Sequence, residues 1–267
     1  MQYALGAIVA LLLVTACSAT PSDIRFANVD GNRVAYRVLG SGGPVLVMIS
    51  GLGEGMDSFS NVAPDLAAHA TVILYDRAGY GQSDPAQTLR DAAGTDRELM
   101  AVLDAAGVHG PYFVLGHSLG GLFAEYFAAH HRDQVAGLIL EESRPAGFSE
   151  RCLALRLSPC GPPAMLVRFM RPGGRAEVAG LVQTEAQVAE ITPGPQPTLV
   201  LSRSVPVRPN AIDGLWAQFQ VDLAARYPGA RRLVAPQGGH AIHREARDWF
   251  IAQVRDFLSA STPAIQN

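Results

Sequence analysis

One serine and one histidine lie in sequence contexts that suit nucleophilic catalysis. Ser118 is the central residue of a G-x-S-x-G motif, which follows a short apolar run and precedes a helical pattern. The flanking glycines permit a tight turn that would expose the serine hydroxyl at the end of a strand. His240 comes late in the chain, after two glycines. A neutral imidazole there can accept the serine proton and return it to a leaving group, so the pair predicts acyl transfer.

Alternating strand and helix patterns would position these two residues. Short apolar runs predict strands at 45–49, 71–75, 112–115, 135–140, 198–201 and 232–235, after a hairpin of 24–29 and 34–39 that turns at Asp30-Gly31. Helical patterns lie at 59–69, 89–106, 119–131, 212–226 and 244–259. This alternation predicts an α/β fold with a mostly parallel central sheet flanked by helices. Ser118 would then sit between a strand and the helix that follows it.

Three segments together resemble the α/β-hydrolase superfamily, in particular its serine-nucleophile, esterase- and lipase-like members. They are residues 50–53 (SGLG), 76–83 (DRAGYGQS) and 116–120 (GHSLG). The resemblance implies that Asp76 is structural rather than catalytic, and that the amides of Leu52 and Leu119 form an oxyanion hole. Ser50 stands where the family usually has histidine, but the hole uses backbone N–H groups and need not be lost. The resemblance implies no cofactor and no metal.

Two carboxylates compete for the role of the acid that orients His240. The family usually places the acid after the strand predicted at 198–201, but residues 202–208 contain no carboxylate. The next carboxylate is Asp213, which an N-terminal helix cap would also explain. Some members place the acid just after the sixth strand, where this chain has Glu141 and Glu142. Glu142 is favoured over Asp213, because it lies at the exit of the strand.

The segment 145–197 interrupts the alternation and is rich in Pro, Gly and Arg, with two weak helical patterns. We interpret it as a cap insertion within a single domain of residues 23–267. Five apolar side chains of this segment are expected either to line an acyl pocket or to pack the insertion against the domain. They are Met165, Leu166, Val167, Phe169 and Met170. Cys152 and Cys160 also fall here, and they are expected either to form a disulfide or to remain two buried thiols.

The first residues predict export. Residues 3–16 are apolar but too short to span a bilayer comfortably, as in a signal peptide covering 1–16. Val14-Thr15-Ala16-Cys17 resembles a bacterial lipobox, in which Cys17 would carry the lipid, although residues 1–4 contain no Lys or Arg. Residues 17–22 would form a tether. The expected location is therefore the bacterial cell envelope, with membrane attachment through an N-terminal lipid.

The composition narrows the classes of function. Hydrophobic residues make up 48% and charged residues 17%, and the net charge is −3 without a basic stripe, which gives nucleic-acid binding no support. The leading expectation is a hydrolase that cleaves ester or related acyl bonds of a small molecule through an acyl-enzyme. The alternative is a catalytically weak ligand-binding or envelope scaffold protein on the same fold. A perhydrolase-like activity would need the same triad.

Overall fold

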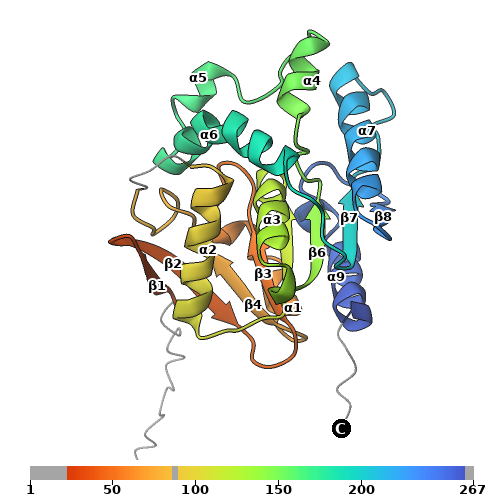
Figure 1. The fold of residues 1–267 in the computed structure, drawn as a ribbon. Coiled ribbons are helices and arrows are strands. Elements are labelled where there is room, and N and C mark those ends of the chain that lie inside the picture. Colours follow the sequence, from red (N-terminus) through yellow and green to blue (C-terminus); the bar gives the residue numbers. More distant parts are fainter. Residues whose placement is uncertain (1–22, 86–89, 262–267) are drawn as a thin grey trace, which may run out of the picture.

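A single eight-stranded sheet forms the centre of the molecule (Figure 1). The computed structural model describes residues 23–85 and 90–261. The strand order is β1-β2-β4-β3-β5-β6-β7-β8; β2 runs antiparallel to both of its neighbours, β1 and β4, and the remaining pairs are parallel. The strands are β1 (Arg25–Val29), β2 (Asn32–Leu39), β3 (Val45–Ile49), β4 (Thr71–Tyr75), β5 (Tyr112–His117), β6 (Val135–Glu141), β7 (Thr198–Ser202) and β8 (Arg231–Val234). The predicted fold class is confirmed.

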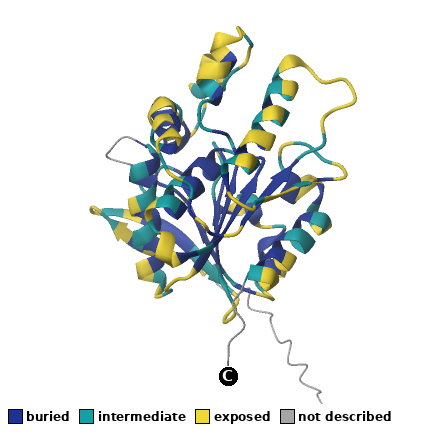
Figure 2. Cartoon of the chain, turned by 45° about the vertical axis from the view of Figure 1, so that its right-hand side comes forward, coloured by how far each residue is buried: buried dark blue, intermediate teal, exposed yellow. Residues whose placement is uncertain are grey.

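The predicted strands all form, with ends that shift by at most two residues. The side chains of β3 to β7 are largely buried on both faces, because helices cover both sides of this part of the sheet (Figure 2). Asp30 and Gly31 both have positive φ angles, of 51° and 86°, as a two-residue hairpin turn requires. In the register of β5 and β6, His117 lies opposite Glu141. Ser118 and Glu142 therefore leave the same edge of the sheet side by side.

Four long helices cover the two faces. They are α2 (Ala92–Ala106), α3 (Leu119–His130), α7 (Ala211–Arg226) and α9 (Arg247–Ser261). Asp91 caps the start of α2, and Gly107 ends it in the left-handed conformation expected of a glycine there. These helices agree with the patterns in the sequence. Each buries one apolar stripe against the sheet, which fixes the strand ends that carry the site.

Two predicted helices are not continuous. The pattern at 59–69 yields only the 3-10 turn η1 (Met56–Phe59) and the short α1 (Ala63–Leu66), because Pro64 sits in the first turn of α1 and cannot donate to the turn before it. The pattern at 244–259 divides at Ala246, which has non-helical angles, into α8 (Ile242–Glu245) and α9. The short α8 leads directly out of the loop that carries His240.

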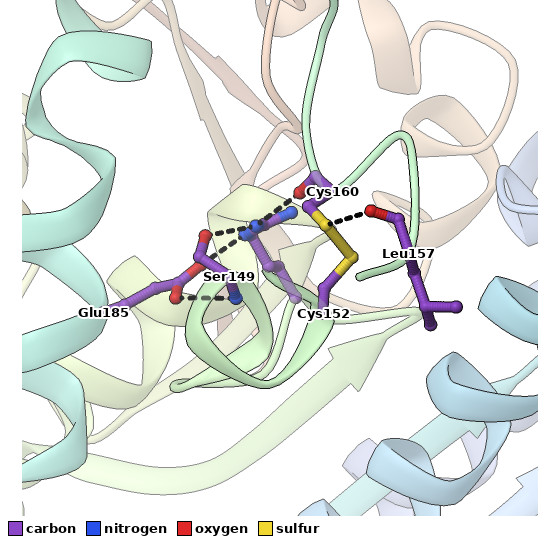
Figure 3. Close-up of a disulfide and its surroundings, with 6 residues drawn as sticks. Ser149, Cys152, Leu157, Cys160 and Glu185 are labelled. Atoms are coloured by element: carbon purple, nitrogen blue, oxygen red, sulfur yellow. Dashed lines mark hydrogen bonds and ion pairs between the residues drawn. A yellow bond between two sulfur atoms is a disulfide. The ribbon is translucent and has the colours of Figure 1, made fainter. Parts of the chain in front are cut away.

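The connection between β6 and β7 contains more helix than its sequence indicates. It forms α4 (Phe148–Ala154), α5 (Ala164–Val167) and α6 (Pro172–Ala189), which lie beyond the carboxyl end of the parallel strands (Figure 1). A disulfide joins Cys152 in α4 to Cys160 in the following loop, with an S–S distance of 2.04 Å (Figure 3). Arg144 ties this loop down, because its guanidinium donates to the Cys160 carbonyl and pairs with Glu185 of α6.

No helix within the described residues is long and apolar enough to cross a membrane. The predicted signal peptide, Cys17 and the tether lie outside the described residues.

A buried carboxyl between α3 and α7 makes the stability depend on pH. Glu125 is fully buried and accepts hydrogen bonds from the Tyr227 hydroxyl at 2.9 Å and from Arg226 at 3.4 Å. Burial raises the pKa of Glu125 from 4.5 to about 7, against the opposing effect of the Arg226 charge. Because the folded-state pKa is the higher one, this stabilising contribution is complete below pH 4.5 and is lost as the pH rises through 7.

Glu125→Gln should remove this pH dependence. The difference between the two pKa values corresponds to about 3 kcal/mol of unfolding free energy. Relative to wild type, we expect the variant to gain about this amount as the pH rises from 4.5 to 8 in urea titrations at a series of pH values. The glutamine keeps an acceptor for Tyr227. Parallel stability curves for the two proteins would contradict the burial argument.

Candidate active site

The turn between β5 and α3 holds Ser118 in a strained conformation. Its φ of 53° and ψ of −120° are rare for a residue with a side chain. Gly116 lies against the backbone of Gly120 and Gly121, and Gly120 lies against the Ile49 and Ser50 carbonyls of the neighbouring strand end. Side chains at these glycines would push α3 away from the sheet. The motif therefore gives the sharp turn that the sequence predicts, with the hydroxyl at the carboxyl end of the strands.

Gly120→Ala should destabilise the protein strongly, because its new methyl group would overlap the Ile49 carbonyl oxygen. We expect a loss of about 3 kcal/mol of unfolding free energy in urea titrations followed by circular dichroism. Gly214→Ala is the matched control, since Gly214 lies within α7 and a methyl group there meets open space. The control should gain up to about 1 kcal/mol from the better helix propensity of alanine. Equal effects of the two changes would contradict the close packing of the turn.

His240 reaches Ser118 from the loop after β8. Its Nε2 lies 2.8 Å from the Ser118 Oγ, which is hydrogen-bond distance. The imidazole side chain is 44% exposed. The loop is held from behind, because the His117 Nε2–H donates to the His240 carbonyl at 3.0 Å. The imidazole can therefore accept the serine proton while its backbone stays fixed.

Glu142 lies on the other side of the His240 ring. Its Oε2 is 3.4 Å from the His240 Nδ1, and its side chain is completely buried. Two further donors fix the carboxylate: the Arg203 amide at 2.8 Å and the Trp216 indole N–H at 2.9 Å. The Trp216 ring also packs edge-on against the imidazole, with centroids 5.4 Å apart. Ser118, His240 and Glu142 thus form a contiguous row with the order of a hydrolase triad.

The competing carboxylate, Asp213, has a different task. It completes a capping box at the start of α7 by accepting from the Asn210 amide, and it pairs with Arg203 at 2.9 Å. No contact between Asp213 and His240 is recorded among the described residues. His243, three positions after His240 and therefore the other histidine of this region, is buried against Glu141, with Nδ1 at 2.8 Å from Oε1. Each of the two residues therefore has a structural partner of its own.

The loop after β3 lies against the serine. A side chain at Gly51 would come within 3.3 Å of the Ser118 Cβ. The amides of Gly51, Gly53 and Glu54 all donate to groups within the protein, two of them to acceptors in the loop itself. Leu52 lies among them in the loop. Leu119 is the first residue of α3, so its N–H has no partner within the helix. Leu52 and Leu119, the two predicted oxyanion donors, thus belong to two different elements, one packed against Ser118 and the other following it in the chain.

A buried ion pair holds this loop in place. Arg77 donates to the carbonyls of Ser50 and Gly51 at 2.7 and 2.9 Å, and it pairs with Glu177 of α6 at 2.6 Å. The Tyr80 hydroxyl donates to the same carboxylate at 2.6 Å and accepts from the Gly53 amide. The Ser50 hydroxyl also accepts from Arg77, at 3.0 Å, so Ser50 anchors this guanidinium through its side chain as well. These contacts join the loop after β3, which contains Leu52 and which we call the oxyanion loop, to the connection between β6 and β7.

Asp76 is structural, as the resemblance implies. Its carboxylate accepts from the amides of Met56 and Gln82, at 2.8 and 3.2 Å.

A second polar network behind the site was not predicted from the sequence. The His117 Nδ1 lies 3.2 Å from Glu54, and Glu141 holds both the amide and the ring of His243. Burial by itself lowers the pKa of His117, but the charges of Glu141 and Glu54 outweigh it and the pKa is raised. Burial by itself raises the pKa of Glu141, but the two imidazoles outweigh this effect, and the pKa of Glu141 is lowered. The two carboxylates therefore favour the protonated form of His117 beneath the His240 loop.

Three members of this network could in principle ligate a metal ion. The nearest ligating atoms of His117, Glu141 and His243 lie within 4.8 Å of one another, and all three side chains are buried. Hydrogen bonds already use these atoms: the His243 ring binds Glu141, and the His117 ring binds Glu54 and the His240 carbonyl. Because these atoms already form hydrogen bonds within the protein, the cluster fits a structural hydrogen-bond network better than a metal centre.

The apolar group proposed for an acyl pocket is largely exposed instead. Met165, Leu166 and Phe169 all face solvent, with Phe169 80% exposed. These three side chains therefore neither line a pocket nor bury the insertion. A cavity of about 330 Å³ lies on the other side of the acid, between α7 and β8, and its lining includes Glu142, Arg203 and Trp216 but not Ser118.

Comparisons with known proteins agree with the geometry. Residues 44–175 match the family model for the α/β-hydrolase fold. A putative carbamate hydrolase of Azorhizobium caulinodans is 34% identical over 174 residues, which cover 61% of this chain and 65% of that protein. The crystal structure of a hydrolase from Pseudomonas aeruginosa has 25% identity and a TM-score of 0.64, covering 89% of this chain and 98% of that one.

An uncharacterized protein of Mycobacterium tuberculosis is 37% identical over 123 residues, or 45% of this chain. The match spans only 35% of that relative's length. With the sheet order and the strained serine turn, these similarities show that the chain has the α/β-hydrolase fold.

Proposed function

We propose that the protein is a serine hydrolase that cleaves ester or related acyl bonds of small molecules. The observation that carries the proposal is the 2.8 Å contact between the Ser118 hydroxyl and the His240 Nε2, with Glu142 behind the ring. A hydroxyl and an imidazole at this distance form the minimum apparatus for transferring an acyl group. No cofactor is needed for this chemistry.

In the proposed mechanism the Ser118 oxygen attacks the substrate carbonyl while His240 takes its proton. The carbonyl π electrons move onto oxygen, where the Leu52 and Leu119 amides stabilise the negative charge. As the oxyanion collapses, the bond to the leaving alcohol breaks, and His240 returns the proton to that alcohol. Water, deprotonated by His240, then attacks the acyl-enzyme and releases the acid and the serine. Glu142 keeps the imidazole oriented and stabilises its protonated form.

A fluorophosphonate probe tests the proposal directly, because it labels only an activated serine. We expect the wild-type protein to be labelled at Ser118, as shown by peptide mass spectrometry, and to hydrolyse p-nitrophenyl esters of short acids. Preincubation with the probe should abolish the hydrolysis. A folded wild-type protein that neither labels nor cleaves any ester of a graded panel would overturn the proposal and favour a ligand-binding or scaffold role.

We further propose that the protein is exported and lipidated at Cys17. The support is the lipobox-like sequence together with the Cys152–Cys160 disulfide, since such bonds persist in oxidising compartments. The intact mass of the mature N-terminus checks this proposal: a chain that still begins at Met1 would contradict it.

A further inference from the structure

Large apolar side chains are exposed along one continuous part of the connection between β6 and β7. Five of them lie between α4 and the residues after α5, namely Leu153, Leu155, Met165, Leu166 and Phe169. Met165 is 74% exposed and Leu153 is 66% exposed. Exposing a cluster of such side chains to water costs free energy, and such patches usually mark a contact surface. We refer to residues 151–175 as the α4–α5 rim.

The charge of this rim is of one sign. Residues 151–175 contain five arginines and no Asp or Glu, whereas the chain as a whole has a net charge of −3. All five are exposed, and none forms an ion pair with another described residue: Arg151, Arg156, Arg168, Arg171 and Arg175. Of the nearby acidic residues that the structure describes, Glu177 and Glu185 are buried and paired with Arg77 and Arg144, and only Glu150 in α4 is exposed beside the rim. The guanidinium groups of the rim are therefore available to an external anion.

The rim is held in place by the rest of the fold. The disulfide closes the loop that follows α4, and Arg144 joins the Cys160 carbonyl to α6 (Figure 3). At the other end, the Gly173 amide donates to the Gly79 carbonyl at 3.1 Å. The apolar side chains cannot easily fold back onto the domain. Their exposure is thus a built feature of this end of the molecule (Figure 2).

The rim also borders the mouth of the site. The terminal methyl group of Met170 would lie within 3.6 Å of a side chain at Gly53, which is in the oxyanion loop beside Leu52. Figure 1 shows α4 and α5 at the end of the molecule to which the parallel strands point. A flat partner that contacts the rim would therefore lie close to the loop that packs against Ser118.

We propose that the α4–α5 rim is a docking surface for an anionic lipid bilayer. Leucine, methionine and phenylalanine side chains enter the boundary between headgroups and acyl chains, while arginines bind lipid phosphates. A second copy of the chain fits less well, because two rims would bring ten like charges together. The proposal concerns binding and does not rest on the proposed hydrolysis.

A tryptophan placed in the rim reports on this contact at one defined position. The full-length chain with Cys17→Ser, to keep it free of lipid, carries Phe169→Trp, and the emission of the same chain without it is subtracted to remove Trp216 and Trp249. Phe26→Trp, at an exposed aromatic position of β1, is the matched control. The probes are vesicles of phosphatidylcholine alone and vesicles with about a third phosphatidylglycerol.

We expect the emission at position 169 to shift to the blue with anionic vesicles and to be quenched by brominated lipid, with no such change at position 26. The apparent affinity should fall at least about tenfold in neutral vesicles, and again when Arg168→Glu and Arg171→Glu are added. Both arginines are exposed, so circular dichroism and the thermal midpoint should stay at the parent values.

Three outcomes would overturn the proposal. They are an unchanged spectrum at position 169, equal shifts at positions 169 and 26, and a blue shift without vesicles that grows with protein concentration and mass. An unchanged spectrum would show that the rim does not contact lipid. Equal shifts would show that the contact is not specific to the rim, and a shift without vesicles would show that the rim mediates self-association. Because the readout is lipid contact, it is independent of whether Ser118 proves to be a nucleophile.

Discussion

Replacing Ser118 by alanine should lower kcat/KM for p-nitrophenyl ester hydrolysis by at least about 10⁴-fold, while leaving the thermal midpoint close to that of the wild type. The loss is large because the hydroxyl both forms the acyl-enzyme and supplies the proton that His240 moves. The main-chain turn around the residue stays the same, since it is fixed by Gly116 and Gly120 rather than by the hydroxyl. Steady-state kinetics with an active-site titration measures the effect.

His240→Gln provides the comparison, because the serine and the histidine would act as a unit. We expect a loss of similar size, and a double variant with Ser118→Ala that is no slower than either single variant. Multiplicative losses would show that the two residues act independently, against the proposed mechanism. Activity retained in Ser118→Ala at more than about a tenth of wild type would show that another group attacks the substrate.

Glu142→Gln should lower kcat by about 10² to 10⁴-fold with little change in KM. The amide keeps an acceptor oxygen for only one of the two donors, because the Arg203 N–H and the Trp216 indole bind different oxygens of Glu142, and it loses the charge that stabilises a protonated His240. The expected loss is smaller than that of Ser118→Ala, because attack and oxyanion stabilisation remain. Fluorophosphonate labelling should slow in parallel with kcat.

Asp213→Asn is the matched control, since both carboxylates contact Arg203. It should leave kcat within about twofold and weaken the cap of α7, at a cost of about 1 kcal/mol of unfolding free energy. If Asp213→Asn slowed hydrolysis more than Glu142→Gln, the assignment of the acid would be wrong.

The sequence contains most of the information that defines the sheet. Continuous apolar runs identify β3 to β7, because a strand that is buried on both faces has apolar residues at successive positions. Ser118 and His240 could likewise be found, because glycine spacing is a local signal that survives in a single sequence. Glu142 could be favoured only through a resemblance to related proteins.

Other features depend on contacts between distant residues. The pairing of Glu54 with His117 spans 63 positions, and that of Glu141 with His243 spans 102. Nothing in the local sequence distinguishes these residues from surface polar groups. The helix α6 is difficult to predict for a different reason, because its apolar periodicity is weak. It contains three glycines, and its buried face includes Glu177, Thr184 and Glu185. Its partners, Arg77 and Arg144, lie far away in the chain.

Two consecutive carboxylates at the end of β6 bind two imidazoles that are three positions apart in another loop: Glu141 holds His243, and Glu142 faces His240. One insertion or deletion between the two histidines would leave one carboxylate without its ring. The number of residues between the two histidines is therefore set by the spacing of the two carboxylates, and the side chains of the two residues between them are not.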